Sequence, residues 1–358
     1  TIIDGMPAGL YVDKSIIDLD LARRMLGYGR GKRMAIESDK VDILSGLRKE
    51  RTIGSPISLL VKNIDDSIDR LSKVYEPRPG HADLSGILKY NLSDIRDVLE
   101  RASARETVSR VAVGAICKIL LAEFGITVVS HVVAIGAAVS KAKNLTFKRI
   151  VSSSIKSPVM CADAKASVSM CKEIDKAMSA GDTLGGIFEI LIHGVPPGLG
   201  SYAQWDRRID GSLAKAIMSI QAIKGVDFGT GFESASLKGS LAHDEIFYDK
   251  RRGFYRKSNN AGGIEGGMTT GEDIIIRAAM KPISTLRRPL SSVDIRTKKQ
   301  VMATVERSDV CAVPAAAVIG EAVSSIEIAN SLIEKFAGDS IPEMKRNYDG
   351  YLAQIKRF

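Results

Sequence analysis

The chain has 358 residues, 45% of them hydrophobic, which is enough to bury a large core in one big domain or two ordinary ones. Its 51 Lys and Arg against 42 Asp and Glu give a net charge of +9, which suits nucleic acid, an acidic membrane surface or a small polyanionic substrate. Aromatic residues make up only 5% and no basic block is interleaved with them, so a surface that stacks nucleic-acid bases is not expected.

Membrane insertion is not expected either. No apolar run reaches the roughly 18 residues of a membrane span, and the start shows no signal-peptide pattern. Cys117, Cys161, Cys171 and Cys311 are widely spaced and have no histidine at ligand spacing, which predicts free thiols rather than disulfides or a metal site. A soluble protein in a reducing, cytoplasmic compartment is the expectation.

Strands and helices alternate along the chain. The segment RRMLGYGRGKRM (23–34) contains a G-x-G-x-G pattern, which lets the backbone approach a ligand. Its arginines, Arg23, Arg24, Arg30 and Arg33, supply forked donors. A mobile basic loop is the alternative. Neither a P-loop nor a dinucleotide-binding glycine pattern is present.

RPGHAD (78–83) places His81 between Arg78 and Asp83 in a stretch too rich in Pro and Gly for a helix interior. On position alone it would be a solvated turn residue.

SARE (103–106) predicts a capping box, in which Ser103 accepts from the amide three residues on and Glu106 reaches back. A helix therefore begins near residue 104. Its open amides and dipole attract an anion, and Arg101 and Arg105 flank that end, as expected of a phosphate or carboxylate receptor.

Later segments predict two strands, ITVVSHVVAIGAAV (126–139) and EDIIIRAAM (272–280), and hence a mixed α/β chain in a single domain. GVPPGLGSYA (194–203) weakly resembles the phosphate loop of small-metabolite kinases. NNAGGIEGGMTTGE (259–272) predicts an ordered ligand loop.

A weak repeat predicts two pseudo-equivalent halves, about 1–130 and 190–335, facing each other across one site. The paired segments are 2–10 with 191–199, 51–63 with 268–282, and 101–121 with 307–326.

Nine motifs in order resemble the chorismate synthase family from Thr1 to about Lys335: YGRGKRM, RPGHAD, RASARET, GVPPGLGS, WDRRIDG, MSIQAIKGVDFG, AGGIEGGMTTGE, MKPISTL and ERSDVCAVPAAAVIGEA. The resemblance implies a lyase of the shikimate pathway that converts 5-enolpyruvylshikimate 3-phosphate to chorismate by anti-1,4 elimination, using reduced FMN. It also implies an α+β fold, a β-α-β sandwich, in a homotetramer built as a dimer of dimers. NADPH is one candidate reductant for the flavin.

The resemblance also assigns roles. His81 would protonate reduced FMN, which suits an imidazole, and Asp309 would take the proton from flavin N5. The substrate carries two carboxylates and a phosphate, which match a cluster of arginines. Its expected ligands are Arg24, Arg30, Arg33, Arg78, Arg105 and Arg307. The expected flavin or nicotinamide contacts are Arg24, Arg30, Arg101, Ala102, Ser103, Gln221, Ala222, Gly266, Lys281, Pro282, Ile283, Ser284, Thr285 and Arg307. No metal is expected.

The sequence departs from the family in two places. Relatives begin with a strand and a G-E-S-H-G motif ahead of the segment at Thr1, and we expect that this segment is missing from the given sequence. Asn260 stands where many relatives have Arg, which leaves the affinity for FMN open. His131 and His193 are expected to be structural and His243 to lie on the surface. A small-metabolite kinase using 196–203 and a noncatalytic anion- or flavin-binding module remain as alternatives.

Overall fold

The computed structural model describes residues 1–31, 39–64, 70–142, 145–306 and 308–358. The helices in these ranges are α1 (Lys14–Met25), α2 (Asp83–Tyr90), α3 (Ile95–Arg101), α4 (Thr107–Ala122), α5 (Phe147–Ser154), α6 (Ala164–Ala180), α7 (Ile209–Met218), α8 (Gly239–Ala242), α9 (Val313–Phe336) and α10 (Ile341–Arg357), with 3-10 turns η3 (Ala104–Glu106), η4 (Trp205–Arg207) and η5 (Gly231–Ser236).

The larger sheet has the strand order β7-β6-β8-β14-β9 and the smaller one β1-β5-β2, and four two-stranded pairings complete the set. The strands are β1 (Ile2–Ile3), β2 (Val41–Ile43), β3 (Leu47–Arg48), β4 (Arg51–Thr52), β5 (Ile57–Val61), β6 (Thr127–Ile135), β7 (Ala138–Val139), β8 (Gly186–His193), β9 (Ile223–Phe228), β10 (Ile246–Asp249), β11 (Gly253–Arg256), β12 (Ile264–Glu265), β13 (Met268–Thr269), β14 (Ile274–Met280), β15 (Ser291–Val293) and β16 (Gln300–Met302).

One face of the five-stranded sheet is apolar. In β8, every second residue from Phe188 to Ile192, namely Phe188, Ile190 and Ile192, is completely buried. The antiparallel register places Ile276 of β14 opposite Ile190. This is the period-two pattern of a strand with one buried face. The predicted strands at 126–139 and 272–280 are confirmed as β6 with β7 and as β14.

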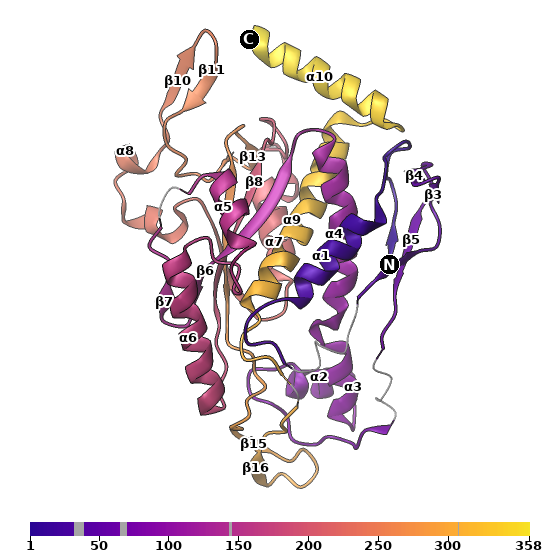
Figure 1. Cartoon of the computed structure of the whole chain (residues 1–358), viewed down its shortest axis with the longest axis vertical. Helices are drawn as coiled ribbons and strands as arrows, with labels where there is room; N and C mark the ends of the chain where they lie inside the picture. Colours follow the sequence, from indigo (N-terminus) through magenta and orange to yellow (C-terminus); the bar gives the residue numbers. More distant parts are fainter. Residues whose placement is uncertain (32–38, 65–69, 143–144, 307) are drawn as a thin grey trace.

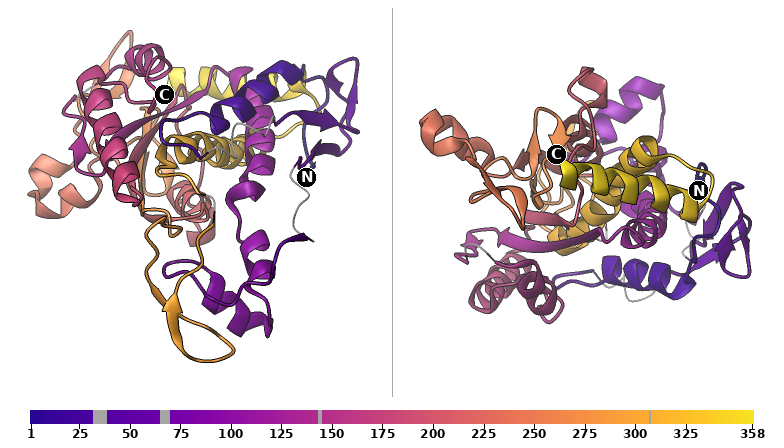
Figure 2. Two further views of the ribbon diagram at one scale, coloured as in Figure 1. Left: turned by 60° about the horizontal axis from the view of Figure 1, so that its bottom comes forward. Right: turned by 90° about the horizontal axis from the view of Figure 1, so that it is seen from above.

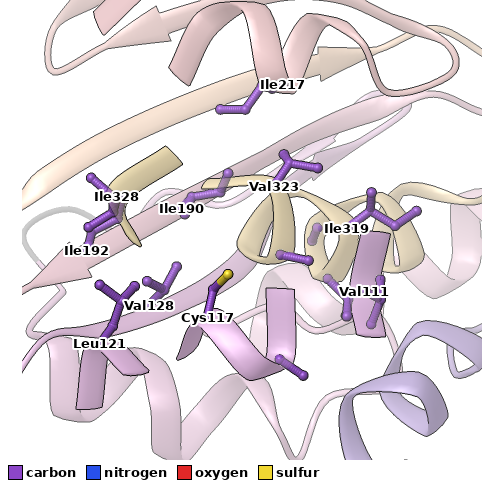
Figure 3. Packing of buried hydrophobic residues seen from close by; sticks show 14 of the residues in the cluster. Val111, Cys117, Leu121, Val128, Ile190, Ile192, Ile217, Ile319, Val323 and Ile328 are labelled. Atoms are coloured by element: carbon purple, nitrogen blue, oxygen red, sulfur yellow. The ribbon is translucent and has the colours of Figure 1, made fainter. Parts of the chain in front are cut away.

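Helices α4 and α9 pack against each other and against the two sheets, α4 on β5 and α9 on β6 and β8 (Figure 1). Figure 3 shows Cys117 and Leu121 of α4 among side chains of the sheet, with Val323 of α9 close by. The hydrophobic core therefore fills the space between the sheets, and both helices belong to it.

The same order of elements occurs twice. A strand, a helix and two further strands precede a long helix, first as β1, α1, β2, β5 and α4, then as β8, α7, β9, β14 and α9. The sheet orders β1-β5-β2 and β8-β14-β9 correspond strand by strand. Other elements, α2 and α3 among them, lie between the members of these sets, and the division into two halves stays a prediction.

Helix α9 corrects one expectation, since its 24 residues are long and apolar enough by composition to cross a membrane. Most of the apolar window, 72%, is buried inside the molecule, as expected for the core helix of a folded domain. The prediction that no apolar run reaches this length was therefore wrong.

A buried charge network joins α1, α4, α9 and β6. Both carboxylate oxygens of Glu321 accept from Arg23, at 2.7 and 2.9 Å, and Lys118 donates to Glu321 and to Asp20. Ser130 of β6 donates its amide and its hydroxyl to Glu321. Burial alone would raise the pKa of Glu321, but Lys118 and Arg23 lower it to about 2. Arg23, predicted to offer donors to a ligand, belongs to this network instead.

A glycine sets the distance between the two core helices. A Cβ on Gly114 of α4 would lie 2.4 Å from Cα of Ala322 in α9. We expect Gly114→Ala to destabilise the protein by about 1–3 kcal/mol through overpacking. Gly350→Ala in α10, where no atom lies within 4 Å of the new Cβ, should instead stabilise by roughly 0.5–1 kcal/mol. Thermal unfolding of both variants measures this, and equal shifts would contradict close packing at Gly114.

The Glu321 network should make stability depend on acid pH. A folded-state pKa near 2 lies below the roughly 4.3 of an unfolded glutamate, so the stabilisation is complete above about pH 5 and is lost as pH falls toward 2. We expect Glu321→Gln to cost about 3–5 kcal/mol at pH 7 and to reduce the slope of Tm against pH below 5.

The control is Glu123→Gln, which removes a surface pair with Lys345 and should cost at most about 1 kcal/mol. Equal losses in the two variants would show that the buried network adds nothing beyond a surface ion pair.

Candidate active site

His81 is held by a buried carboxylate. Asp83, at the start of α2, is completely buried, and one of its oxygens lies 2.5 Å from Nδ1 of His81. Burial would raise the pKa of Asp83, but hydrogen bonds from His81 and Arg78 bring it well below its usual range. Nη2 of Arg78 lies 3.0 Å from the same ring nitrogen, so His81 is held between a carboxylate and a guanidinium. The His81 side chain is only 21% exposed, which excludes a freely solvated turn residue.

Arg78 connects this turn to the segment 281–285. Its Nε donates to Asp83 at 2.9 Å, and Nη1 donates to the Thr285 hydroxyl at 2.7 Å. Lys281 donates to the carbonyl of Gly80, where a φ of +77° favours glycine. Two segments that are far apart in the sequence thus meet around His81.

Asp309 is bound on both of its oxygens. Nη1 of Arg30 and the amide of Gly31 each donate to it at 2.6 Å. A Cβ on Gly31 would lie 3.0 Å from the Ser308 carbonyl, so a glycine permits this approach of the loop. The expected catalytic carboxylate and an expected substrate arginine therefore form one ion pair.

A second group of cations gathers at the start of α4. Arg24 is 6% exposed and donates to Ala104 O at 3.1 Å and to Thr107 Oγ1 at 3.0 Å. Arg24 and Arg105 also share a carboxylate, that of Asp39.

The charges around Arg24 form one electrostatic neighbourhood. Burial is the main cause that lowers the pKa of Arg24 to about 10; Arg30 and Arg105 also lower it, while Asp39 and Asp309 oppose the shift. Arg24 therefore interacts electrostatically with Arg105, near the start of α4, and also with Arg30 and Asp309.

The predicted capping box does not form. The helical segment begins near residue 104 as predicted, with η3, but Ser103 Oγ accepts from the Arg105 amide, two residues on. The Glu106 carboxylate binds Arg110 and the Gln221 amide instead of reaching back. A local partner, Arg110, and a distant one, Gln221, thus bind Glu106 in place of the predicted cap.

Further contacts close these segments into a ring. Gln221 bonds Glu106 at 2.7 Å, and the Lys281 amide donates to Ala222 O at 2.9 Å. On the other side, Leu184 N donates to Val310 O at 2.9 Å and Thr183 Oγ1 donates to Ile283 O at 2.6 Å. We call these segments, 24–31, 78–83, 101–107, 183–184, 221–222, 281–285 and 308–310, the site ring.

The site ring lies at one end of the five-stranded sheet, where β14 ends and β8 begins. Figure 2 shows α2 and α3 at the same end of the molecule as β15 and β16, and hydrogen bonds from Ile295 to Tyr75 and from Thr304 to Glu76 join these parts. Helix α3 ends at Arg101, and the chain continues through Ala102 and Ser103 in the ring segment 101–107. Pro282 and Ser284 lie within its 281–285 segment.

One expected contact lies elsewhere, and two fall outside the described residues. Gly266 lies in the β12–β13 turn beside the start of α7, where Ile209 N donates to Gly267 O. Arg33 and Arg307 fall outside the described residues.

The glycine-rich loop is ordered by a side chain that the sequence analysis missed. The carboxylate of Asp244 is 8% exposed and accepts from the amides of Asn260 and Ala261 and from Ser258 Oγ. Those two amides were expected to be open to a ligand, and Asp244 binds them instead. Asp244 stands in the segment AHDE (242–245), and its carboxylate was the only sign of this contact in the sequence.

The remaining histidines agree with their expected roles. His131 in β6 is buried and bonds Glu189 at 3.1 Å. His193, at the end of β8, bonds Asp273 and stacks on Phe147. His243 is exposed, and the four cysteines are free thiols.

A cavity of about 320 Å³ lies beside the site ring rather than inside it. It is lined by Arg110, Ser212, Lys215, Ala216, Ser219, Val323, Ile326 and Glu327. It touches the ring only through Arg110, the partner of Glu106, so the site is defined by its charged groups and not by this cavity.

The comparisons with known proteins agree with one another. A family model described as chorismate synthase matches residues 1–333. A protein named chorismate synthase from Geobacter sulfurreducens is 54% identical over 376 residues, covering 100% of this chain and 96% of that protein. Its counterpart from Desulforamulus reducens is 54% identical over 369 residues, covering 99% and 95%.

The structural comparison gives the same answer. A solved structure titled "Crystal Structure of Chorismate Synthase" has a TM-score of 0.83 and 41% identity, covering 100% of this chain and 94% of the other. Together with the site ring, these matches show that the chain belongs to the chorismate synthase family and is a carbon–oxygen lyase acting on phosphates (EC 4.2.3.5) in the shikimate pathway.

Proposed function

We propose that this enzyme converts 5-enolpyruvylshikimate 3-phosphate to chorismate and phosphate by anti-1,4 elimination, with reduced FMN bound at the site ring. The observation that carries the proposal is the ring itself, in which hydrogen bonds connect the segments bearing Arg24, Arg30, Arg78, Arg105 and Lys281 to His81 and Asp309. A trianionic substrate needs such a concentration of fixed cations.

The residues present fit a flavin. Two of its expected contacts carry buried polar atoms that lack a hydrogen-bond partner among the described residues, Arg30 Nε and Gln221 Oε1. Buried polar atoms are normally satisfied, so a bound group with its own donors and acceptors would explain both. Arg101 to Ser103, Ala222 and Lys281 to Thr285 would hold it, and reduced FMN, when bound, would supply electron density to the substrate as its allylic phosphate leaves.

The protein side of the chemistry rests on two groups. Asp83 and Arg78 hold the ring of His81, with Arg78 Nη2 at 3.3 Å from Nε2, and His81 is the group that would deliver a proton at the flavin side of the site. Asp309 takes up the proton released at the reacting centre, and Arg30 and the Gly31 amide hold its oxygens in position.

The wider proposal concerns the assembly. We infer a single-domain β-α-β sandwich of two pseudo-repeated halves, supported by the corresponding strand orders. We also propose a cytoplasmic homotetramer, a dimer of dimers, that uses no metal and no nucleic-acid partner and draws on NADPH or another reductant. Exposed apolar side chains on the β1–β5–β2 sheet, Ile2 and Leu60 among them, support association.

The kinase alternative is not favoured. The amides of Gly198 and Leu199, in the loop that resembles a kinase phosphate loop, donate to the carbonyl and hydroxyl of Thr269 at 2.8 Å. A loop whose amides are already bonded has less to offer a phosphate.

The function is tested by an anaerobic assay of the protein with dithionite-reduced FMN and 5-enolpyruvylshikimate 3-phosphate. We expect chorismate absorbance to appear together with one equivalent of inorganic phosphate, and none without reduced flavin. Binding of oxidised FMN without turnover would support the noncatalytic module instead. Turnover that requires ATP and magnesium would support the kinase.

His81 is tested by His81→Asn, whose amide can still donate to Asp83 but cannot transfer a proton. We expect a loss of turnover of roughly 10²-fold or more, with the fold and FMN binding retained. His243→Asn, at an exposed histidine, is the matched control and should turn over normally. Unchanged turnover in His81→Asn would remove His81 from the chemistry.

A further inference from the structure

Asp39 lies between two arginines of the site ring. Its side chain is 1% exposed, and its two oxygens point to different partners: Oδ2 lies 3.3 Å from Arg24 Nη1, and Oδ1 lies 2.5 Å from Arg105 Nη1. The partners stand 15 residues before and 66 residues after it in the chain. One carboxylate therefore ties the end of α1 to the start of α4.

This bridge completes the binding of both guanidinium groups. Arg24 donates its other edges to Ala104 O and Thr107 Oγ1, so Asp39 supplies the third fixed point of a planar group. Arg105 is held in addition by Lys62 O and Asn63 Oδ1. Three contacts fix both the position and the plane of such a fork.

The bridge also balances charge where two cations would repel each other. Arg24 is faced by two cations, Arg30 and Arg105, and by two carboxylates, Asp39 and Asp309. Asp309 is already bonded by Arg30 and Gly31. Asp39 is thus the carboxylate that Arg24 and Arg105 share, and its loss would leave one buried and one half-buried cation less compensated beside each other.

We propose that Asp39 is a positioning residue, which sets the spacing and orientation of Arg24 and Arg105 so that both engage the anionic groups of one substrate molecule. The inference rests on the proposed function of the site ring. Asp39 does not touch the substrate; it acts through the two arginines.

The chain offers a matched control. Asp20, in α1, is like Asp39 a buried carboxylate that binds two cations, in this case Arg23 and Lys118. These two cations belong to the core network and not to the site ring. Asp20→Asn and Asp39→Asn therefore remove the same charge from similar surroundings. A purely structural role predicts the same kinetics for both variants.

The experiment measures kcat, KM for 5-enolpyruvylshikimate 3-phosphate and Tm for the full chain and both variants with reduced FMN. We expect Asp39→Asn to raise KM on the order of tenfold or more and to lower kcat less, because the arginines bind substrate in the ground state as well as in the transition state. Asp20→Asn should lower Tm and leave KM within about twofold. Equal KM values in the two variants would overturn the inference.

Asp39→Glu separates position from charge and carries the test if Asp39→Asn does not fold. It keeps the negative charge but displaces the carboxylate by one methylene, so a positioning role predicts a raised KM and charge balance alone predicts full recovery. Recovery would overturn the inference. An inactive wild-type protein would contradict the proposed function instead, so the two failures are distinguishable.

Discussion

The network of contacts to the carboxylate of Glu321 is the interaction on which the packing of the core depends. It receives Arg23 from α1, Lys118 from α4 and Ser130 from β6, and so fixes three elements against α9 at one buried point. Such a group is stabilising only while all its partners are present, because an unpaired buried charge is costly. Arg24 follows Arg23 directly, so the helix that carries the first arginine of the site ring also carries a partner of Glu321, while Arg24 itself is positioned by Asp39, Ala104 and Thr107.

The site repeats this pattern of cations held by buried or half-buried acids. Asp39 binds Arg24 and Arg105, Asp83 binds Arg78 and His81, and Asp309 binds Arg30. Because these arginines are positioned before any substrate arrives, less side-chain entropy is lost on binding. The arginines of such a site are held in fixed orientations, but the carboxylates that hold them neutralise part of the positive charge.

Much of the fold followed from local patterns, including β6, β14 and the small-residue helices α4 and α9. The clustering of distant arginine motifs followed from the family resemblance, and the site ring is where the structure brings them together. Arg23 and Arg24 could not be distinguished from the sequence, since neighbours on a helix point about 100° apart and only tertiary packing decides that one meets Glu321 and the other Asp39.

The same reason explains the other misses. The capping box predicted at Ser103 does not form because the Glu106 carboxylate binds Gln221 and Arg110 instead. Asp39 carries no local sign of its partner Arg105, which lies 66 residues further along the chain. Asp244 likewise bonds backbone amides that lie 16 and 17 residues away.

Helix α9 has a consequence for the synthesis of the protein. It begins at Val313, near the end of the chain, yet it covers β6 and β8 and packs along α4, all of which leave the ribosome much earlier. Until α9 emerges, the faces of α4 and of the five-stranded sheet that α9 covers stay exposed, although α1 and β5 also pack against α4, and the nascent chain must be kept from aggregating. The core is therefore complete only after α9, which ends at Phe336, has been made.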